Sequence, residues 1–156
     1  MTSLEKIIQF LRAGGVSFRT VQHEATTTSE ASAKARGEDI SVGGKAIVMK
    51  IDGDYKLFVL SAALRIDSQK IKNHFGAKKL RFASAEELSA VTGLVPGSVP
   101  PFGKPILDID LYVDSSIVRN EIIAFNAGSL TDSIVMSTED YLLVARPTLL
   151  EFSQAS

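Results

Sequence analysis

Two glycines lead directly into a lysine in "GGKAIVMK", residues 43–50, where a charged group could do chemistry. The apolar residues that follow indicate a buried strand, in which an isolated charge is costly. Alternation along a strand places Lys45 on the same face as Ile47 and Met49. Two explanations stay open. The Lys45 ammonium extends into water from the frayed start of the strand, or it lies at the edge of a pocket and binds a phosphate or polarises a carbonyl group.

The glycines before Lys45 do not form a nucleotide-triphosphate loop. That motif requires another glycine five residues before Gly44 and a serine or threonine directly after the lysine. Asp39 and Ala46 occupy these two positions. We therefore expect no triphosphate site at this strand.

The segment "GLVPGSVPPFG", residues 93–103, combines glycine and proline in a way that excludes regular secondary structure. Proline restrains the backbone and glycine permits close approach, so we expect a stiff loop whose amides could bind an oxyanion. A structural crossover without chemistry is the alternative. Ser98 is not the nucleophile of a GxSxG elbow, because Gly97 directly precedes it and Pro100 stands where the closing glycine belongs.

A second polar segment, "FNAGSLTDS" at residues 125–133, lies between two predicted strands. Its residues Asn126, Gly128 and Ser129 either cap a turn, which is the common use of such residues, or line a site. Neither explanation is excluded by the sequence.

Metal and thiol chemistry find no support in the sequence. The chain has no cysteine, which excludes disulfides, thiolate zinc sites and a cysteine nucleophile. The histidines, His23 and His74, have no metal-ligand spacing. We expect neither a metal nor another cofactor.

Positive charge is concentrated between residues 68 and 85, a stretch without any acidic residue. Over the whole chain, 17 lysines and arginines balance 18 acidic residues, so any site for a polyanion must be local. The stretch is either a solvated helix and loop or a surface that contacts a nucleic-acid backbone. The candidate tRNA-contacting residues of this basic patch are Lys70, Lys72, Lys78, Lys79 and Arg81.

The 156 residues suit one domain, residues 1–156, with a single core. No apolar run approaches the roughly 20 residues that span a bilayer, and the N-terminus lacks the unbroken apolar region of a signal peptide. We expect a cytoplasmic protein without membrane contact.

Periodicity and capping signals predict helices interleaved with strands. Asp52-Gly53-Asp54 joins two apolar runs and predicts a hairpin whose strands lie centrally in a sheet. The order indicates an α/β fold, a single compact domain with a mixed, mostly antiparallel central sheet flanked by helices. Helices are expected from Thr2 to Gly14, from Thr27 to Gly37, at 67–76, from Ser84 to Val91 and at the end of 132–145; strands are expected at 16–23, 45–61, 78–83, 106–113, 121–129 and the start of 132–145.

Six segments resemble, in the same order, the YbaK and prolyl-tRNA-synthetase-associated editing domain family. They are "TTTSEASA", "GGKAIVMK", "YKLFVLS", "KKLRFASAEEL", "GLVPGSVPPFG" and "FNAGSLTDSI". The resemblance implies a trans-editing hydrolase that deacylates mischarged aminoacyl-tRNA by water attack on the 3′-terminal ester, without a metal or a covalent nucleophile. A non-catalytic module that binds tRNA or an aminoacyl ligand, and an esterase unrelated to tRNA, are the alternatives.

The resemblance also implies roles for individual residues. Lys45 matches a strand lysine that engages the terminal adenosine or its phosphate, and residues 97–103 match the loop that forms the pocket wall. The implied catalytic residues are Lys45, Gly97 and Ser98, and the implied substrate-binding residues are Thr27, Pro100, Pro101, Phe102, Gly103, Asn126, Gly128 and Ser129.

The implied substrate carries a small amino acid, serine or threonine or alanine. Family members that act on alanyl-tRNA typically have a threonine at the position of Pro100, which favours serine or threonine here. Hydroxyl or amide groups that could bind a substrate hydroxyl belong to Thr26, Thr27, Ser98, Asn126 and Ser129. The implied partners are the acceptor end of aminoacyl-tRNA and an aminoacyl-tRNA synthetase, with the protein itself a monomer or a weak homo-oligomer.

Overall fold

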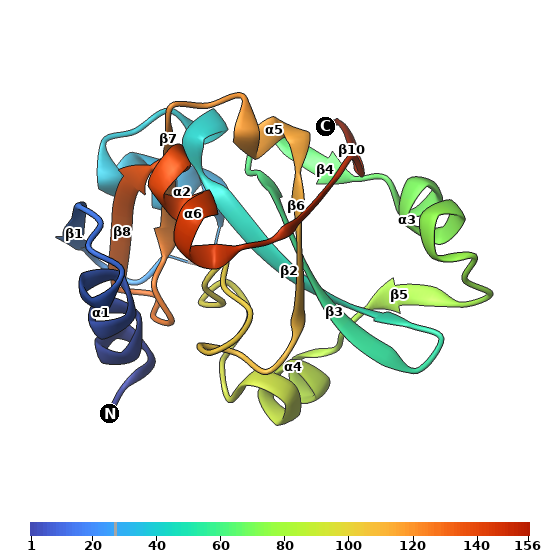
Figure 1. Cartoon of the computed structure of the whole chain (residues 1–156). Coiled ribbons are helices and arrows are strands. Elements are labelled where there is room, and N and C mark those ends of the chain that lie inside the picture. The colour runs from blue at the N-terminus through green and yellow to red at the C-terminus, as the bar shows by residue number, and fades with distance from the viewer. Residues whose placement is uncertain (27) are drawn as a thin grey trace.

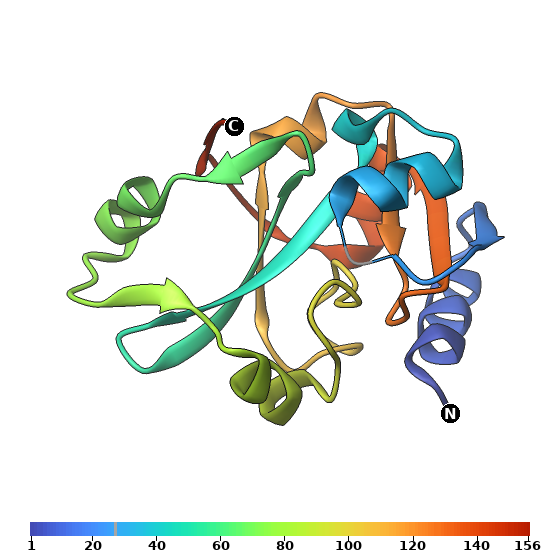
Figure 2. The same cartoon turned by 180° about the vertical axis from the view of Figure 1, so that it is seen from behind.

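The computed structural model describes residues 1–26 and 28–156. Figures 1 and 2 show α1 and α3 at opposite ends of the molecule, with the strands between them. The helices are α1 (Ser3–Ala13), α2 (Ser29–Arg36), η1 (Ile40–Val42), α3 (Ser68–Phe75), α4 (Ala85–Thr92), α5 (Ser115–Val118) and α6 (Thr138–Ala145). The strands are β1 (Phe18–Gln22), β2 (Gly44–Ile51), β3 (Asp54–Ser61), β4 (Leu64–Ile66), β5 (Leu80–Phe82), β6 (Asp110–Asp114), β7 (Ile122–Asn126), β8 (Asp132–Ser137), β9 (Thr148–Leu150) and β10 (Ser153–Ala155).

The strands of the described residues form a five-stranded sheet in the order β5-β2-β3-β6-β9, a three-stranded sheet in the order β1-β8-β7, and the pair β10-β4. The predicted hairpin is confirmed as β2 and β3, with Lys45 opposite Leu60, and both strands are internal to the larger sheet. The β5-β2 and β2-β3 pairs are antiparallel, whereas β3-β6 and β6-β9 are parallel. The mixed α/β fold is therefore confirmed, and the smaller sheet adds only antiparallel pairs.

The two larger sheets meet where β2 begins. Gly43 forms an isolated parallel bridge with Ala124 of β7. A Cβ atom on Gly44 would lie 2.7 Å from Cδ1 of Ile123, so only glycine permits this approach without displacing the buried isoleucine. The start of β2 is thus held against β7.

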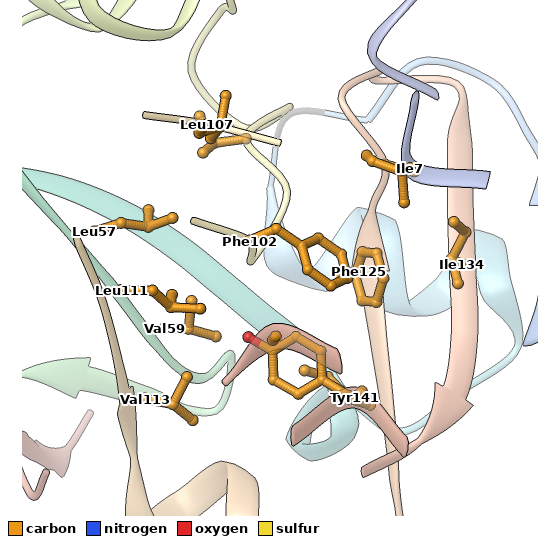
Figure 3. Close-up of a cluster of buried hydrophobic side chains, with 14 of the residues drawn as sticks. Ile7, Leu57, Val59, Phe102, Leu107, Leu111, Val113, Phe125, Ile134 and Tyr141 are labelled. Carbon is orange, nitrogen blue, oxygen red and sulfur yellow. The ribbon is translucent and has the colours of Figure 1, made fainter. Parts of the chain in front are cut away.

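The five-stranded sheet packs on both faces. One core cluster contains Phe102, whose ring centroid lies 5.4 Å from that of Phe125 and 5.5 Å from that of Tyr141 (Figure 3). The other cluster is built around Phe58 and Phe152, at a centroid distance of 5.2 Å. Since both faces of β2 are covered, a charge within this strand has access to water only near its ends.

Capping residues explain where most helices begin. Ser84 and Glu87 form the predicted capping box of α4, and Asp67 caps α3. The cap of α2 corrects the prediction, because the hydroxyl of Thr28 accepts a hydrogen bond from the amide of Ala31. Thr27, the expected cap, lies outside the described residues.

The predicted strand at 106–113 is correct only in its second half. The amides of Ile106 and Leu107 both donate to the carbonyl of Gly103, so the chain turns there and β6 begins at Asp110. The last residues of the chain pair through β10 with β4. No helix of the described residues is long and apolar enough to cross a membrane.

Candidate functional site

A cavity of about 90 Å³ lies where α2, the start of β2, the glycine- and proline-rich loop and the end of β7 meet. Because roughly 10–15 Å³ of such space is enough for one water molecule, the cavity has room for a small side chain. Glycines 43, 44 and 97 contribute backbone to the wall. The polar side chains in the lining are those of Thr28, Ser29, Ser32, Arg36, Lys45 and Asn126.

Lys45, the second residue of β2, lines this cavity and is half-buried. Burial lowers the pKa of its ammonium, against an opposing effect of the Glu30 charge. No acidic residue is in the lining formed by the described part of the chain. Of the two explanations for Lys45, the structure favours the pocket edge, where the ammonium can bind an anion.

Arg36 is a second cation in the lining, and the sequence prediction missed it. Its Nε donates to Oγ of Ser133 at 2.9 Å, and its Nη2 donates to Oδ1 of Asn126 at 3.1 Å. Burial lowers the pKa of the guanidinium to about 10, with the Glu38 charge acting in the opposite direction. In the sequence, an arginine in the last turn of a helix is unremarkable because cations are favoured there, so no signal distinguished it.

Asn126 connects the arginine to the loop. Its Nδ2 donates to the carbonyl oxygen of Gly97 at 2.7 Å. The predicted site residues Lys45, Gly97 and Asn126 are therefore brought together in one lining, although they lie far apart in the sequence.

Ser98 is buried, and its hydroxyl is bound within the loop rather than in the cavity. Its hydroxyl donates to the carbonyl of Val95 at 2.8 Å, and its amide donates to the same oxygen at 3.1 Å. Gly97 and Val99 on either side are in the lining, whereas Ser98 is absent from the lining formed by the described residues. The Ser98 side chain thus stabilises the loop.

The rest of the loop anchors it to the core. Phe102 is fully buried, and the carbonyl of Pro101 accepts a hydrogen bond from the Tyr141 hydroxyl at 2.6 Å. A Cβ on Gly103 would lie 2.7 Å from the carbonyl oxygen of Ile109. The structure does not bring residues 100–103 into the cavity lining of the described chain.

Gly128 and Ser129 belong to a compact turn. Gly128 has φ of +74°, and a Cβ there would lie 2.5 Å from that of Ser3. The Ser129 hydroxyl donates to the Asp132 carboxylate at 2.9 Å. The turn-capping explanation therefore accounts for both, and neither lies in the cavity lining of the described residues. Thr27, the remaining expected substrate contact, lies outside the described part of the chain.

Two further side-chain pairs lie next to residues of the cavity lining. Thr26 and Ser32 hydroxyls lie 2.8 Å apart, and both residues are buried. His23 places Nε2 2.8 Å from the Ser133 hydroxyl, while its Nδ1 lies 2.8 Å from the Glu24 carbonyl. Because a carbonyl only accepts, Nδ1 of His23 carries a proton. No cluster of three or more metal-ligating side chains occurs in residues 1–26 and 28–156.

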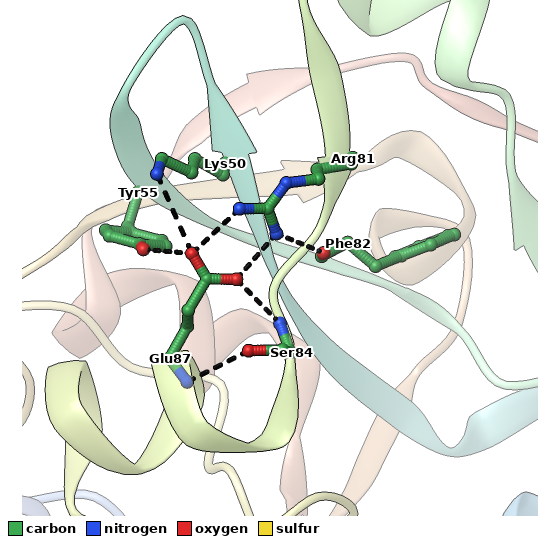
Figure 4. Close-up of polar contacts among 6 residues, drawn as sticks. All are labelled: Lys50, Tyr55, Arg81, Phe82, Ser84 and Glu87. Carbon is green, nitrogen blue, oxygen red and sulfur yellow. Dashed lines mark hydrogen bonds and ion pairs between the residues drawn. The ribbon is translucent and has the colours of Figure 1, made fainter.

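The basic patch is only partly available to a ligand. Arg81 and Lys50 pair with the Glu87 carboxylate, which also accepts from Tyr55 (Figure 4). Hydrogen bonds hold the pKa of the Glu87 carboxyl group well below its usual range, and those from the Arg81 side chain have the largest effect.

The other members of the patch differ in their contacts. Lys70 lies 3.7 Å from a Glu151 carboxylate oxygen. Lys78 and Lys79 donate their backbone amides to the Asp52 carboxylate. The ammonium groups of Lys72, Lys78 and Lys79 form no ion pair with any described residue.

Residues 23–143 match the aminoacyl-tRNA editing domain family. The chain belongs to this family. It is 34% identical over 161 residues to an *Escherichia coli* K12 protein named Multifunctional Ser/Thr-tRNA deacylase ProXp-y, covering 97% of this chain and 93% of that one. It is 23% identical to Prolyl-tRNA editing protein ProX of *Acetoanaerobium sticklandii*, covering 90% and 88% of the two chains.

The editing domain also occurs inside larger proteins. A proline–tRNA ligase of *Shouchella clausii* is 37% identical over 117 residues, which make up 75% of this chain and 20% of the ligase. The fold agrees with a solved structure of a candidate trans-editing enzyme for prolyl tRNA synthetase, with a TM-score of 0.85 at 22% identity and 99% coverage of both chains. The mixed α/β architecture described above is thus the fold of this family.

Proposed function

We propose that this editing domain, residues 1–156, hydrolyses the ester of mischarged aminoacyl-tRNA that carries serine or threonine. The observation that supports this proposal most is the cavity of about 90 Å³. It is lined by hydroxyl groups, an amide and two cations, with no acidic group from the described residues. The volume suits a small side chain, and the cations suit the phosphate and ribose of a tRNA 3′ end. The name of the Escherichia coli relative, a Ser/Thr-tRNA deacylase, supports the same substrate class.

The reaction needs only water and an aligned ester. Water attacks the carbonyl carbon, the bond to the ribose oxygen breaks, and that oxygen takes a proton as the free hydroxyl forms. A ribose hydroxyl beside the ester can position the water. The uncatalysed ester already hydrolyses slowly, and each ~1.4 kcal/mol of transition-state stabilisation accelerates it tenfold.

Backbone donors of the loop would stabilise the oxyanion. The amide of Ser98 donates to the carbonyl of Val95. The amides of Gly97 and Val99 form no hydrogen bond with the described residues, and both residues are in the cavity lining. Such preorganised N–H groups stabilise charge that develops in the transition state. Lys45 would bind the terminal phosphate or adenosine and place the ester against these amides.

Selectivity for a hydroxyl-bearing amino acid would come from the polar lining. Ser32 and Asn126 offer groups that can hydrogen-bond a substrate hydroxyl. Alanine would fit the same volume but could not form a hydrogen bond with these groups, which disfavours its transition state relative to that of serine. The match to proline–tRNA ligases supports a prolyl-tRNA synthetase as the partner whose tRNA is corrected.

Deacylation of seryl-, threonyl- and alanyl-tRNA by the wild type, Lys45→Ala and Lys6→Ala tests this function. Lys6 is exposed on α1 and serves as the matched control. We expect fast loss of the seryl and threonyl esters, slower loss of the alanyl ester, and a defect only in Lys45→Ala. Failure of the wild type to hydrolyse any of the three while still binding tRNA would favour a non-catalytic binding module instead.

A further inference from the structure

Arg36 links α2 to β7 and β8 beside the cavity. From α2 it reaches Asn126 at the end of β7 and Ser133 in β8, which lie side by side with α2 (Figure 2). No carboxylate lies within ion-pairing distance of its guanidinium among the described residues. Arg36 is half-buried, and removing a guanidinium from water without an acidic partner is costly. The hydrogen bonds to Asn126 and Ser133 offset part of this cost.

Arg36 also determines which way the Asn126 amide faces. A guanidinium has only donors, so the atom of Asn126 that faces it must be the acceptor Oδ1. Ser133 is a second donor to the same oxygen, with its Oγ at 3.1 Å. The amide nitrogen of Asn126 is then necessarily directed toward the Gly97 carbonyl, 2.7 Å away. The reversed amide would place its NH₂ against Arg36 and its oxygen against the Gly97 oxygen.

Through Asn126, the hydrogen bonds that start at Arg36 reach the loop at the Gly97 carbonyl. Gly97 has φ of +87°, a conformation that other residues rarely adopt. The bond from Asn126 restrains the peptide plane between Gly97 and Ser98, and therefore the direction of the neighbouring amides in the cavity wall. Without it, this part of the loop is held mainly by the Ser98 contacts to Val95.

We propose that Arg36 is a positioning residue that acts on the deacylation reaction through Asn126, by orienting its amide to hold the Gly97 carbonyl. The inference rests on the proposed function. A direct contact of Arg36 with a substrate phosphate is the competing explanation, and it makes different predictions for KM and for salt dependence.

A double-mutant cycle distinguishes the two explanations. Arg36→Lys keeps the charge but loses the planar guanidinium, whose Nε and Nη2 donate to Ser133 and Asn126 in a fixed geometry. Asn126→Asp keeps an acceptor for Arg36 but removes the donor to Gly97. Arg65→Lys, at an exposed position in β4, is the matched control.

We expect each single variant to lower kcat for seryl-tRNA at least tenfold, with KM within about threefold of wild type and no change for Arg65→Lys. Because both act on one restraint, the double variant should be no slower than the slower single variant. Multiplying defects, or a defect confined to KM that disappears at low salt, would overturn the proposal in favour of direct phosphate contact.

A second readout does not depend on activity. Hydrogen exchange of the Ser98 amide, which donates to the Val95 carbonyl, should accelerate at least tenfold in the free protein in Arg36→Lys and Asn126→Asp, and stay unchanged in Arg65→Lys and Lys45→Ala. Unchanged exchange in Arg36→Lys would refute positioning even if activity falls. If the wild type deacylates nothing, the proposed function and the role of Arg36 in it fail together, whereas the exchange data still show whether the arginine holds the loop.

Discussion

The Tyr141 hydroxyl donates to the carbonyl oxygen of Pro101 over 2.6 Å, and so joins the last helix, α6, to the loop that lines the cavity. The phenol is fully buried, and burial raises its pKa far above the usual range. It therefore remains a neutral donor at any pH at which the protein functions.

Replacing Tyr141 by phenylalanine removes this donor and leaves a buried carbonyl without a partner. We expect a loss of about 1–3 kcal/mol in the free energy of unfolding, measured by urea denaturation. Tyr112→Phe is the control, since its hydroxyl forms no hydrogen bond with the described residues. Equal losses in both variants would show that the Pro101 contact is not the cause.

Asp114 makes the free energy of unfolding depend on pH in the acidic range. Burial opposes its ionisation, but hydrogen bonds from Phe152, Ser116 and Ser153 outweigh this and hold the pKa below its usual range. The unfolded chain then binds more protons near pH 4, so stability is present above the unfolded pKa of about 3.9 and falls as the pH drops through the folded value. Urea denaturation between pH 3 and 7 gives the free energy of unfolding at each pH, and its slope against pH should be smaller for Asp114→Asn than for wild type. An unchanged slope would count against this role of Asp114.

Gly44→Ala tests the close contact between the sheets. The new methyl group would overlap Ile123, and overpacking of a buried site typically costs about 1–3 kcal/mol. The second substitution Ile123→Val removes the overlapping Cδ1 and should restore most of the lost stability in the Gly44→Ala background. If it adds a further loss instead, steric overlap is not the source of the defect.

The lowered pKa of Lys45 predicts alkaline sensitivity of tRNA binding. Because burial disfavours the ammonium, its charge is lost below the ordinary lysine value of about 10.4. Affinity for uncharged tRNA, measured from pH 7 to 10, should fall in this range for wild type. In Lys45→Arg the charge persists, and the fall should move to higher pH. Superimposable profiles would exclude Lys45 as the titrating contact.

The basic patch is expected to contribute through its unpaired members. Replacing Lys78 and Lys79 by glutamine should reduce the slope of log affinity against log salt by about 1.5, because two phosphate contacts are lost. Lys34→Gln, at an exposed position of α2, controls for charge alone. An unchanged slope in the double variant would place the tRNA elsewhere.

Local signals made much of the fold predictable. The Ser84–Glu87 capping box and the hairpin around Gly53 depend on residues a few positions apart, and both are confirmed. The late start of the strand expected at 106–113, which begins only at Asp110, was missed because the turn before it depends on Gly103, which is close in sequence but gives no periodic signal.

The site was less predictable, because its contacts are non-local. Lys45 stood out as a charge inside an apolar strand, and Gly97 stood out by composition. Arg36 did not, since its partners Asn126 and Ser133 lie 90 and 97 positions away in the sequence. Conversely, the family resemblance implied substrate contact for residues 100–103, whereas Pro101 and Phe102 anchor the loop to the core.

The assembly of one small cavity from α2, β2, the loop and β7 has a consequence for folding kinetics. Contacts between such distant segments form only after large loops have closed, and this closure is entropically costly and slow. A partly folded chain, even one in which the β2–β3 hairpin has formed, lacks three of the four walls. Catalytic competence should therefore return only with the final cooperative step of refolding, and a nascent chain could not hydrolyse its substrate before β7 has been synthesised.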